Sequence, residues 1–312
     1  MESEENGNYS TISFDNESTQ HIVQDVIFTL ICIVAMTANV LLICTTFKFK
    51  RMRTVPHIIL ANWAIADLTC LLTTPSTYRL IVMADRISLS SLFMCTLYEV
   101  GSAAQVTVII YAFLLSLDWY IAAYFENASK KFRKYINFYI VIIWISMFSV
   151  LCISIVFCIN RYFAHWIYVI MASFGYICLF LFIIVLQICR IVRKCRRREL
   201  SYPTLMLTIA TALVLSWFMS FAHMCVMGIQ GVFFRIIGII SMTLLFCTGI
   251  LVFIILYKKS NDFHACLNRL LKRDRNNYEE ADFNFHSSGR KPIVKNIAHC
   301  SFNNKEQNVF VC

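Results

Sequence analysis

Long apolar segments alternate with short connections along most of the chain, and every second connection is rich in basic residues. Each segment has about the 20 residues that a helix needs to cross the hydrocarbon core of a bilayer. The pattern predicts seven spans, near 24–47, 58–83, 92–120, 136–158, 166–192, 204–228 and 233–257. A further stretch, 261–272, has apolar residues at helical spacing and basic residues opposite them, which predicts a short amphipathic helix on the membrane surface. The predicted fold class is all-α, a seven-transmembrane helix bundle followed by this amphipathic helix.

Composition agrees with a membrane protein. Hydrophobic residues make up 59% of the 312 positions and charged residues only 15%, outside the usual range for a soluble domain. We expect an extracellular amino-terminal segment over 1–23, the bundle over 24–257 and a cytoplasmic tail over 258–312. The net charge of +10 does not imply nucleic-acid binding, because the basic residues follow the membrane topology.

Lys and Arg predict the orientation. Twenty of the 28 lie near the ends of the first, third, fifth and seventh spans, and four more lie further along the tail. Only four lie towards the opposite side: Arg79, Arg86, Arg161 and Arg235. Basic residues favour the cytoplasmic side, so we expect a multi-pass plasma-membrane protein with its amino terminus outside. Asn8 and Asn16 begin glycosylation motifs on the predicted outer side, whereas the motif at Asn127 is predicted to be cytoplasmic and unmodified.

Cysteines divide into two groups by position. Most lie inside spans as small apolar side chains. Cys95 and Cys158 instead lie at predicted outer helix ends, in an oxidising environment, which favours a disulfide between them. Cys266 lies on the amphipathic helix and is a candidate for palmitoylation.

Polar residues inside the spans are candidate functional groups, because they are unfavourable in a bilayer. Asn39, Asp67 and Thr248 lie at matching depth in three helices, about 13–15 Å from the inner ends at 1.5 Å per residue. They predict a buried polar cluster. Two interpretations remain open, namely a structural clasp and a site for a monovalent cation or water.

Three further polar residues lie in the outer halves of spans. Glu99 and Gln105 are on the third span and His223 is on the sixth. They are candidate ligand contacts, and the alternative is bonding between helices or towards the interface. Phosphate-binding loops, metal-ligand clusters and nucleophile–base pairs are not evident in the sequence, so we expect no enzyme and no other cofactor.

Several segments, in the same order along the chain, resemble the rhodopsin-like G-protein-coupled receptors over roughly residues 24–272. They are Asn39 in the first span, Leu60-Ala-Asn-Trp-Ala-Ile-Ala-Asp67 in the second, Leu117–Ala122 in the third, Trp144 in the fourth, Ser216-Trp217 in the sixth and Ser260–Phe263 after the seventh. The resemblance implies a ligand site that includes Trp217. It also implies an inner coupling region that includes Asp118, Trp119, Tyr120 and Glu199.

The chain departs from the family's pattern at its activation motifs. Trp119 replaces the arginine of Asp-Arg-Tyr, Met219 stands where the sixth helix usually has proline, and Val252–Leu256 occupies the place of Asn-Pro-x-x-Tyr. Trp119 is expected either to wedge between the inner helix ends or to lie in the interfacial aromatic belt.

The resemblance implies a divergent receptor for an extracellular small molecule or peptide, surrounded by membrane lipid. Signalling would run through heterotrimeric G proteins with degenerate activation motifs. Two alternatives remain open. One is a signalling-silent receptor, acting as a scavenger or a partner subunit. The other is a transporter, which the lack of detectable repeats and of Gly/Pro-broken helix pairs disfavours.

Overall fold

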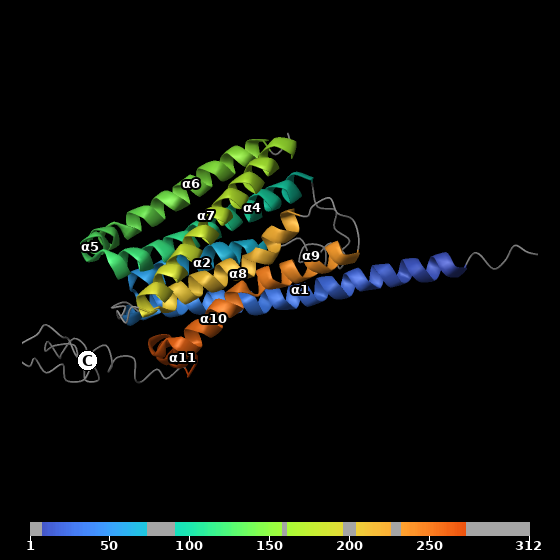
Figure 1. Ribbon diagram of the computed structural model, residues 1–312. Helices are drawn as coiled ribbons and strands as arrows, with labels where there is room; N and C mark the ends of the chain where they lie inside the picture. The colour runs from blue at the N-terminus through green and yellow to red at the C-terminus, as the bar shows by residue number, and fades with distance from the viewer. Residues whose placement is uncertain (1–7, 74–90, 158–160, 196–203, 226–231, 273–312) are drawn as a thin grey trace, which may run out of the picture. The chain divides into compact units, whose positions relative to one another are not determined.

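A computed structural model describes residues 8–73, 91–157, 161–195, 204–225 and 232–272, and all regular elements in these ranges are helices (Figure 1). They are α1 (Asn8–Lys48), the short 3-10 helix η1 (Lys50–Met52), α2 (Val55–Leu72), α4 (Ser91–Tyr124), α5 (Glu126–Lys134), α6 (Ile136–Phe157), α7 (Arg161–Cys195), α8 (Leu205–Cys225), α9 (Val232–Phe246), α10 (Thr248–Lys259) and α11 (Asn261–Lys272).

Six helices in the described ranges are long and apolar enough to cross a membrane, or seven if α9 and α10 count as one bent span. The chain is therefore a multi-pass, all-α membrane protein with six to seven candidate spans. The bounds of α6 lie within one residue of the predicted 136–158, and those of α11 coincide with the predicted 261–272.

The first candidate span, Val23–Lys48, lies within one residue of the predicted 24–47. Its helix α1 begins earlier, at Asn8, so residues 8–23 continue into the helix of the first span. Two other predicted spans differ more from the structure. α2 ends at Leu72, and residues 74–83 of the predicted second span lie outside the described ranges. The seventh span is not one helix, because α9 and α10 meet at a bend of 46°.

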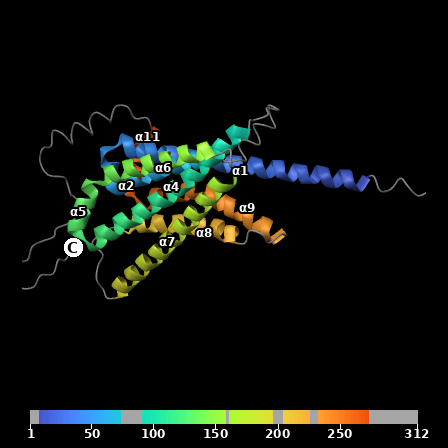
Figure 2. The ribbon, with the colours of Figure 1, turned by 90° about the horizontal axis from the view of Figure 1, so that it is seen from above.

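α4 is the central helix of this arrangement. It contacts α2, α5, α6, α7 and α8, and its contact with α2 is the most extensive between any two of these helices. α1 instead packs against α2, α9 and α10. α6 lies on the side away from α1 in Figure 1, whereas in the view from above in Figure 2 it overlies the first helices. Many of its apolar side chains, including Val141, Ile145 and Phe148, are exposed, as expected for a lipid-facing helix.

The bend between α9 and α10 has a local cause other than proline. The Thr248 hydroxyl donates a hydrogen bond back to the carbonyl of Leu244, 3.1 Å away, an interaction that often bends helices. The next residue, Gly249, lies so close to Asn39 of α1 that an added Cβ would come 2.9 Å from Asn39 Oδ1. Glycine here permits the close approach of α10 to α1.

α11 begins after Ser260, whose hydroxyl accepts a hydrogen bond from the backbone N–H of Phe263 at 3.2 Å and so caps the helix. Phe263, Cys266 and Leu267 are buried, and Arg51 forms an ion pair with Asp262. The chain divides into two units after Leu267; the contacts described here all belong to the first.

Candidate functional site

A hydrogen bond joins two of the three predicted cluster residues. Asn39 Nδ2 of α1 donates to Asp67 Oδ2 of α2 at 2.7 Å, and both side chains are buried. A carboxylate in an apolar interior is stabilised by such a partner. Asn39 Oδ1 is buried without a hydrogen-bond partner in the described part of the chain. This amide oxygen and the Asp67 carboxylate are the groups that could ligate a monovalent cation or water.

Thr248 bonds to a different residue. Its hydroxyl proton is shared between the Leu244 carbonyl and Ser216 Oγ of α8, which lies 3.2 Å from Thr248 Oγ1, and both Thr248 and Ser216 are buried. The predicted three-residue cluster is thus two adjacent pairs, Asn39–Asp67 and Thr248–Ser216. Gly249 follows Thr248 and contacts Asn39, so the two pairs meet at the start of α10.

Glu99 is the most unusual of the ligand candidates. It is only 4% exposed, and its Oε2 is buried without a hydrogen-bond partner among the described residues. Gln105, further along α4, is half-buried. His223 lies across from Gly238, where an added Cβ would come 3.0 Å from its Nε2; this contact joins the end of α8 to α9.

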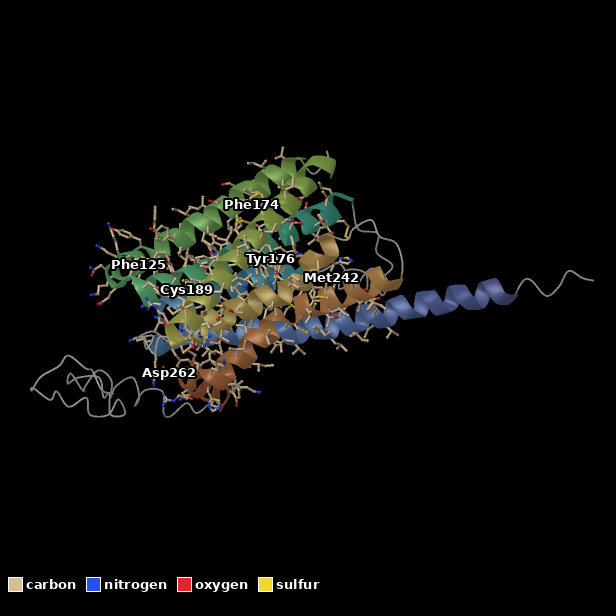
Figure 3. All side chains as sticks on the ribbon, viewed as in Figure 1. Phe125, Phe174, Tyr176, Cys189, Met242 and Asp262 are labelled. Carbon is tan, nitrogen blue, oxygen red and sulfur yellow. The ribbon has the colours of Figure 1, made fainter. Side chains whose placement is uncertain are left out.

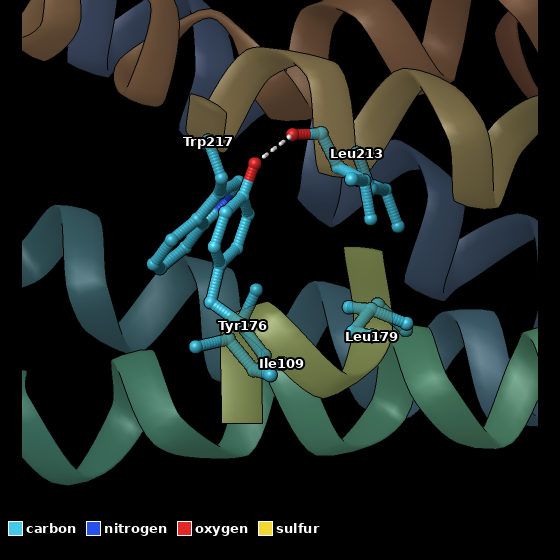
Figure 4. Close-up of a pocket in the computed structure, with 8 residues that line it drawn as sticks. Ile109, Tyr176, Leu179, Leu213 and Trp217 are labelled. Carbon is cyan, nitrogen blue, oxygen red and sulfur yellow. Dashed lines mark hydrogen bonds between the residues drawn. The ribbon is translucent and has the colours of Figure 1, made fainter. Parts of the chain in front are cut away.

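A small apolar pocket lies between α4, α7 and α8, and Trp217 forms part of its lining (Figure 4). The ring of Tyr176 lies beside Trp217, and the Tyr176 hydroxyl donates to the carbonyl of Val214 at 3.1 Å. Trp217 Nε1 is buried without a hydrogen-bond partner in the described ranges. Trp217 therefore contributes apolar surface to the pocket and leaves one donor unused.

At the other end of α4, Asp118 pairs with an arginine that sequence reasoning missed. Arg133 of α5 donates through Nε to Asp118 Oδ1 at 3.2 Å and through Nη2 to Oδ2 at 3.3 Å. The Asp118 side chain is 1% exposed and that of Arg133 32%. The paired geometry suits a guanidinium and a carboxylate. An arginine of the connecting helix α5 thus neutralises the carboxylate next to Trp119.

Trp119 is completely buried, at 0% exposure. Of its two expected positions, the structure therefore excludes the interfacial aromatic belt. Its ring meets Tyr124 edge to face, with centroids 6.3 Å apart. The guanidinium of Arg193, on α7, lies 3.9 Å from the centre of the Tyr124 ring, a cation–π contact. Tyr120 also packs against Tyr124, with the ring planes tilted by 38° and the centroids 5.1 Å apart.

The other predicted residues lie partly inside and partly outside the described ranges. Glu199 and Cys158 lie outside the described residues. Cys95 is disulfide-bonded. Because Cys158 lies outside the described residues, the pairing of the two stays a prediction. Asn8 is the first residue of α1, and Asn16 also lies in that helix. Cys266 is buried, so palmitoylation would require its thiol to become exposed.

Two more partners could not be identified from the sequence. Trp144 Nε1 of α6 donates to Asn62 Oδ1 of α2 at 3.0 Å, and Gln187 Nε2 of α7 donates to Thr211 Oγ1 of α8 at 2.7 Å. Asn62 and Asp67 are two polar residues on the same helix, five positions apart. Only this repetition could have suggested a second polar contact on α2.

Within the described ranges, the His, Cys, Asp and Glu side chains form no group of three or more that could hold a metal ion. Buried polar pairs thus link the helices. A small pocket and the buried Glu99 carboxylate lie towards one end of α4, and the contacts of Arg133 and Arg193 lie at its other end. No known family model matches the chain, and no curated protein matches it either.

Proposed function

We propose that this chain is a divergent rhodopsin-like receptor. In this proposal it binds an extracellular small molecule or peptide and signals inward through heterotrimeric G proteins. The observation that carries the proposal is the hydrogen bond between Asn39 and Asp67. The resemblance rests on these residues in two different helices, and a chance likeness would give no reason for their side chains to meet in the interior.

A second contact supports the same proposal. Trp144, the fourth-helix tryptophan of the resemblance, bonds to Asn62, which lies within the resembling segment of the second helix. α2 therefore receives polar contacts from α1 and from α6 at residues that the resemblance singles out. Through these contacts, a change in the packing of one of the three helices would reach the other two.

The proposed mechanism is a shift in population between two helix packings. Ligand would bind near Glu99, Gln105, Trp217 and His223, towards the Glu99 end of α4. Trp217 adjoins Tyr176, which bonds to the backbone of α8, so a ligand that moves this tryptophan would act on α8 and α7 together. At the Asp118 end, the ion pair to Arg133 and the cation–π contact to Arg193 would hold the resting packing. Their release would open a surface for the G protein.

One observation favours a signalling-silent receptor as the second candidate. The residue in place of the family's arginine is Trp119, which is fully buried, and the neighbouring carboxylate is already paired with Arg133. Neither residue is therefore available to a G protein in this packing. A scavenger or a partner subunit would not require either residue to be available to a G protein.

The two candidates differ in what release of the Arg133 contact does. The full chain, tagged at its amino terminus, is expressed with Arg133→Gln and, as a matched control, with Lys258→Gln, which changes an exposed residue at the end of α10. Variants are compared at equal surface level by flow cytometry. Basal dissociation of Gα from Gβγ is measured for each Gα class. The receptor proposal expects Arg133→Gln to raise basal dissociation for at least one class, about two- to fivefold, with the control unchanged. Silence of the parent and both variants with all classes would favour the silent receptor.

A further inference from the structure

α5 divides its basic residues between two opposite faces. Ser129, Phe132 and Arg133 face inward and are buried or half-buried, with Arg133 engaged by Asp118. Lys130, Lys131 and Lys134 are exposed on the other face. Nine residues at 100° per residue place these lysines together. The inward ion pair therefore fixes which way the lysines point.

The position of α5 brings this lysine face to the boundary between protein and lipid. α5 leads directly into α6 and is held to it by stacking of Phe132 on Tyr139, with centroids 5.6 Å apart. Only 17% of the α6 span is buried inside the protein, against 61% of the α4 span. Since α6 faces lipid along most of its length, the helix at its end lies beside the lipid headgroups.

Exposed aromatic residues flank the lysine face. Phe125 precedes α5 and projects from the end of α4 (Figure 3), and Tyr135 follows α5; both are exposed. Phe138 and Tyr139 are exposed on the first turn of α6. Aromatic side chains concentrate at the membrane–water interface, so this group indicates the level of the headgroups. The ammonium of Lys134 lies 5.7 Å from the centre of the Tyr135 ring.

The exposed lysines have little internal compensation. Lys130 pairs with Glu126 at 2.9 Å, and this hydrogen bond and charge hold the pKa of the Glu126 carboxyl below its usual range. Among the described residues, neither Lys131 nor Lys134 forms an ion pair with an acidic side chain. Two uncompensated cations, a third shared with Glu126, and adjoining aromatic rings form a surface that is complementary to anionic headgroups.

We propose that the outer face of α5, formed by Lys130, Lys131 and Lys134, binds anionic lipid headgroups of the bilayer. The phosphates of the headgroup contact the ammonium groups, while Phe125 and Tyr135 insert among the upper acyl carbons. The site is independent of any ligand at the Glu99 end. It would operate equally in a signalling receptor and in a silent one.

Native mass spectrometry of the full chain, purified in detergent, tests this surface. The probes are phosphatidylinositol 4,5-bisphosphate and, as the neutral reference, phosphatidylcholine. We expect the parent protein to retain the anionic lipid in preference. The double variant Lys131→Gln/Lys134→Gln should lower its apparent affinity about 30-fold, whereas Lys131→Arg/Lys134→Arg keeps it. Both lysines are exposed, so the thermal midpoint should not change.

The matched control is Lys258→Gln/Lys259→Gln, which removes the same charge from two exposed lysines at the end of α10. This control should retain the lipid. Equal losses in the two double variants would overturn the proposal, because net charge alone would then account for binding. Equal retention of phosphatidylcholine and the anionic lipid by the parent would also overturn the proposal. It would indicate that the lysine face of α5 contacts only solvent.

Discussion

The Asp118 carboxylate and the Arg133 guanidinium face each other through two hydrogen bonds, although the residues lie fifteen positions apart. Asp118 belongs to α4, the central helix, whereas Arg133 belongs to the short connecting helix α5. Trp119 follows Asp118 directly and stands where the resembling family has arginine. The guanidinium that faces the aspartate is thus supplied from a connection between helices. The contact ties α5 to the end of α4.

Loss of either partner of this pair should destabilise the protein. Arg133→Gln leaves a buried carboxylate without a counter-charge, and breaking a buried pair costs about 3–5 kcal/mol. Because the Arg133 side chain is about one-third exposed, solvent screening lowers the expected loss to roughly 1–3 kcal/mol. Thermal unfolding of the purified chain is the measurement. The double variant Asp118→Asn/Arg133→Gln should regain part of the loss, whereas additive effects would show that the two side chains do not interact.

The contact between Gly249 and Asn39 can be tested by adding one methyl group. In Gly249→Ala the new Cβ would lie 2.9 Å from Asn39 Oδ1 and 3.0 Å from Nδ2, so Asn39 must move and weaken its bond to Asp67. Overpacking of this kind costs about 1–3 kcal/mol. The thermal midpoint should therefore fall.

Its matched control is Gly175→Ala on α7, where the nearest atom would be Ile109 Cγ2 at 3.5 Å, an ordinary contact distance. This variant should melt close to the parent. Asn39→Ala should remove the clash, so the double variant Asn39→Ala/Gly249→Ala should be no less stable than Asn39→Ala alone. A further loss in the double variant would contradict this explanation.

The sequence predicted the spans because their signal is local. α6 and α11 are recognised from hydropathy or helical spacing alone, and their bounds agree within a residue. α5 was missed because nine residues, four of them basic, resemble a simple basic connection. Its helix is favoured by Glu126 in the first turn and by Lys131, Arg133 and Lys134 in the last, in accord with the helix dipole.

The candidate site was harder to predict because its contacts are tertiary. Matching depth correctly brought Asn39 near Asp67, since depth follows from counting along two helices. Depth alone gives no rotation about the helix axis, and Thr248 bonds to Ser216 instead. The bend at Cys247 has no proline to signal it. Arg133 entered the prediction only as one of the basic residues that indicate the orientation. Such a count cannot identify a partner for Asp118.

Glycan mapping tests the predicted orientation. Asn8 and Asn16 should carry glycans in eukaryotic cells, whereas Asn127 should not. Asn127 is exposed on α5, so burial would not explain the lack of a glycan there. Single Asn→Gln variants are compared on gels before and after N-glycosidase treatment. A glycan on Asn127 would reverse the orientation and place α5 outside the cell.

The last prediction moves the arginine from α5 to the position of Trp119. Trp119→Arg alone should be poorly tolerated. It removes a fully buried indole, and the new guanidinium is buried while Asp118 remains paired with Arg133. Large-to-small changes of a buried tryptophan cost about 3–5 kcal/mol, and an unpaired buried cation adds to that loss. We expect the variant to reach the cell surface at well below half the parent's level.

The double variant Trp119→Arg/Arg133→Gln frees Asp118 to pair with the new arginine. It should regain surface level relative to Trp119→Arg, even though Arg133→Gln alone is destabilising. Trp119→Phe is the control for packing, because it retains an aromatic ring beside Tyr124 without adding charge. If the receptor proposal is correct, the double variant should also show the strongest basal G-protein dissociation at equal surface level. No recovery of surface level would mean that an arginine at position 119 cannot reach Asp118. Recovery without any G-protein response would favour the signalling-silent receptor.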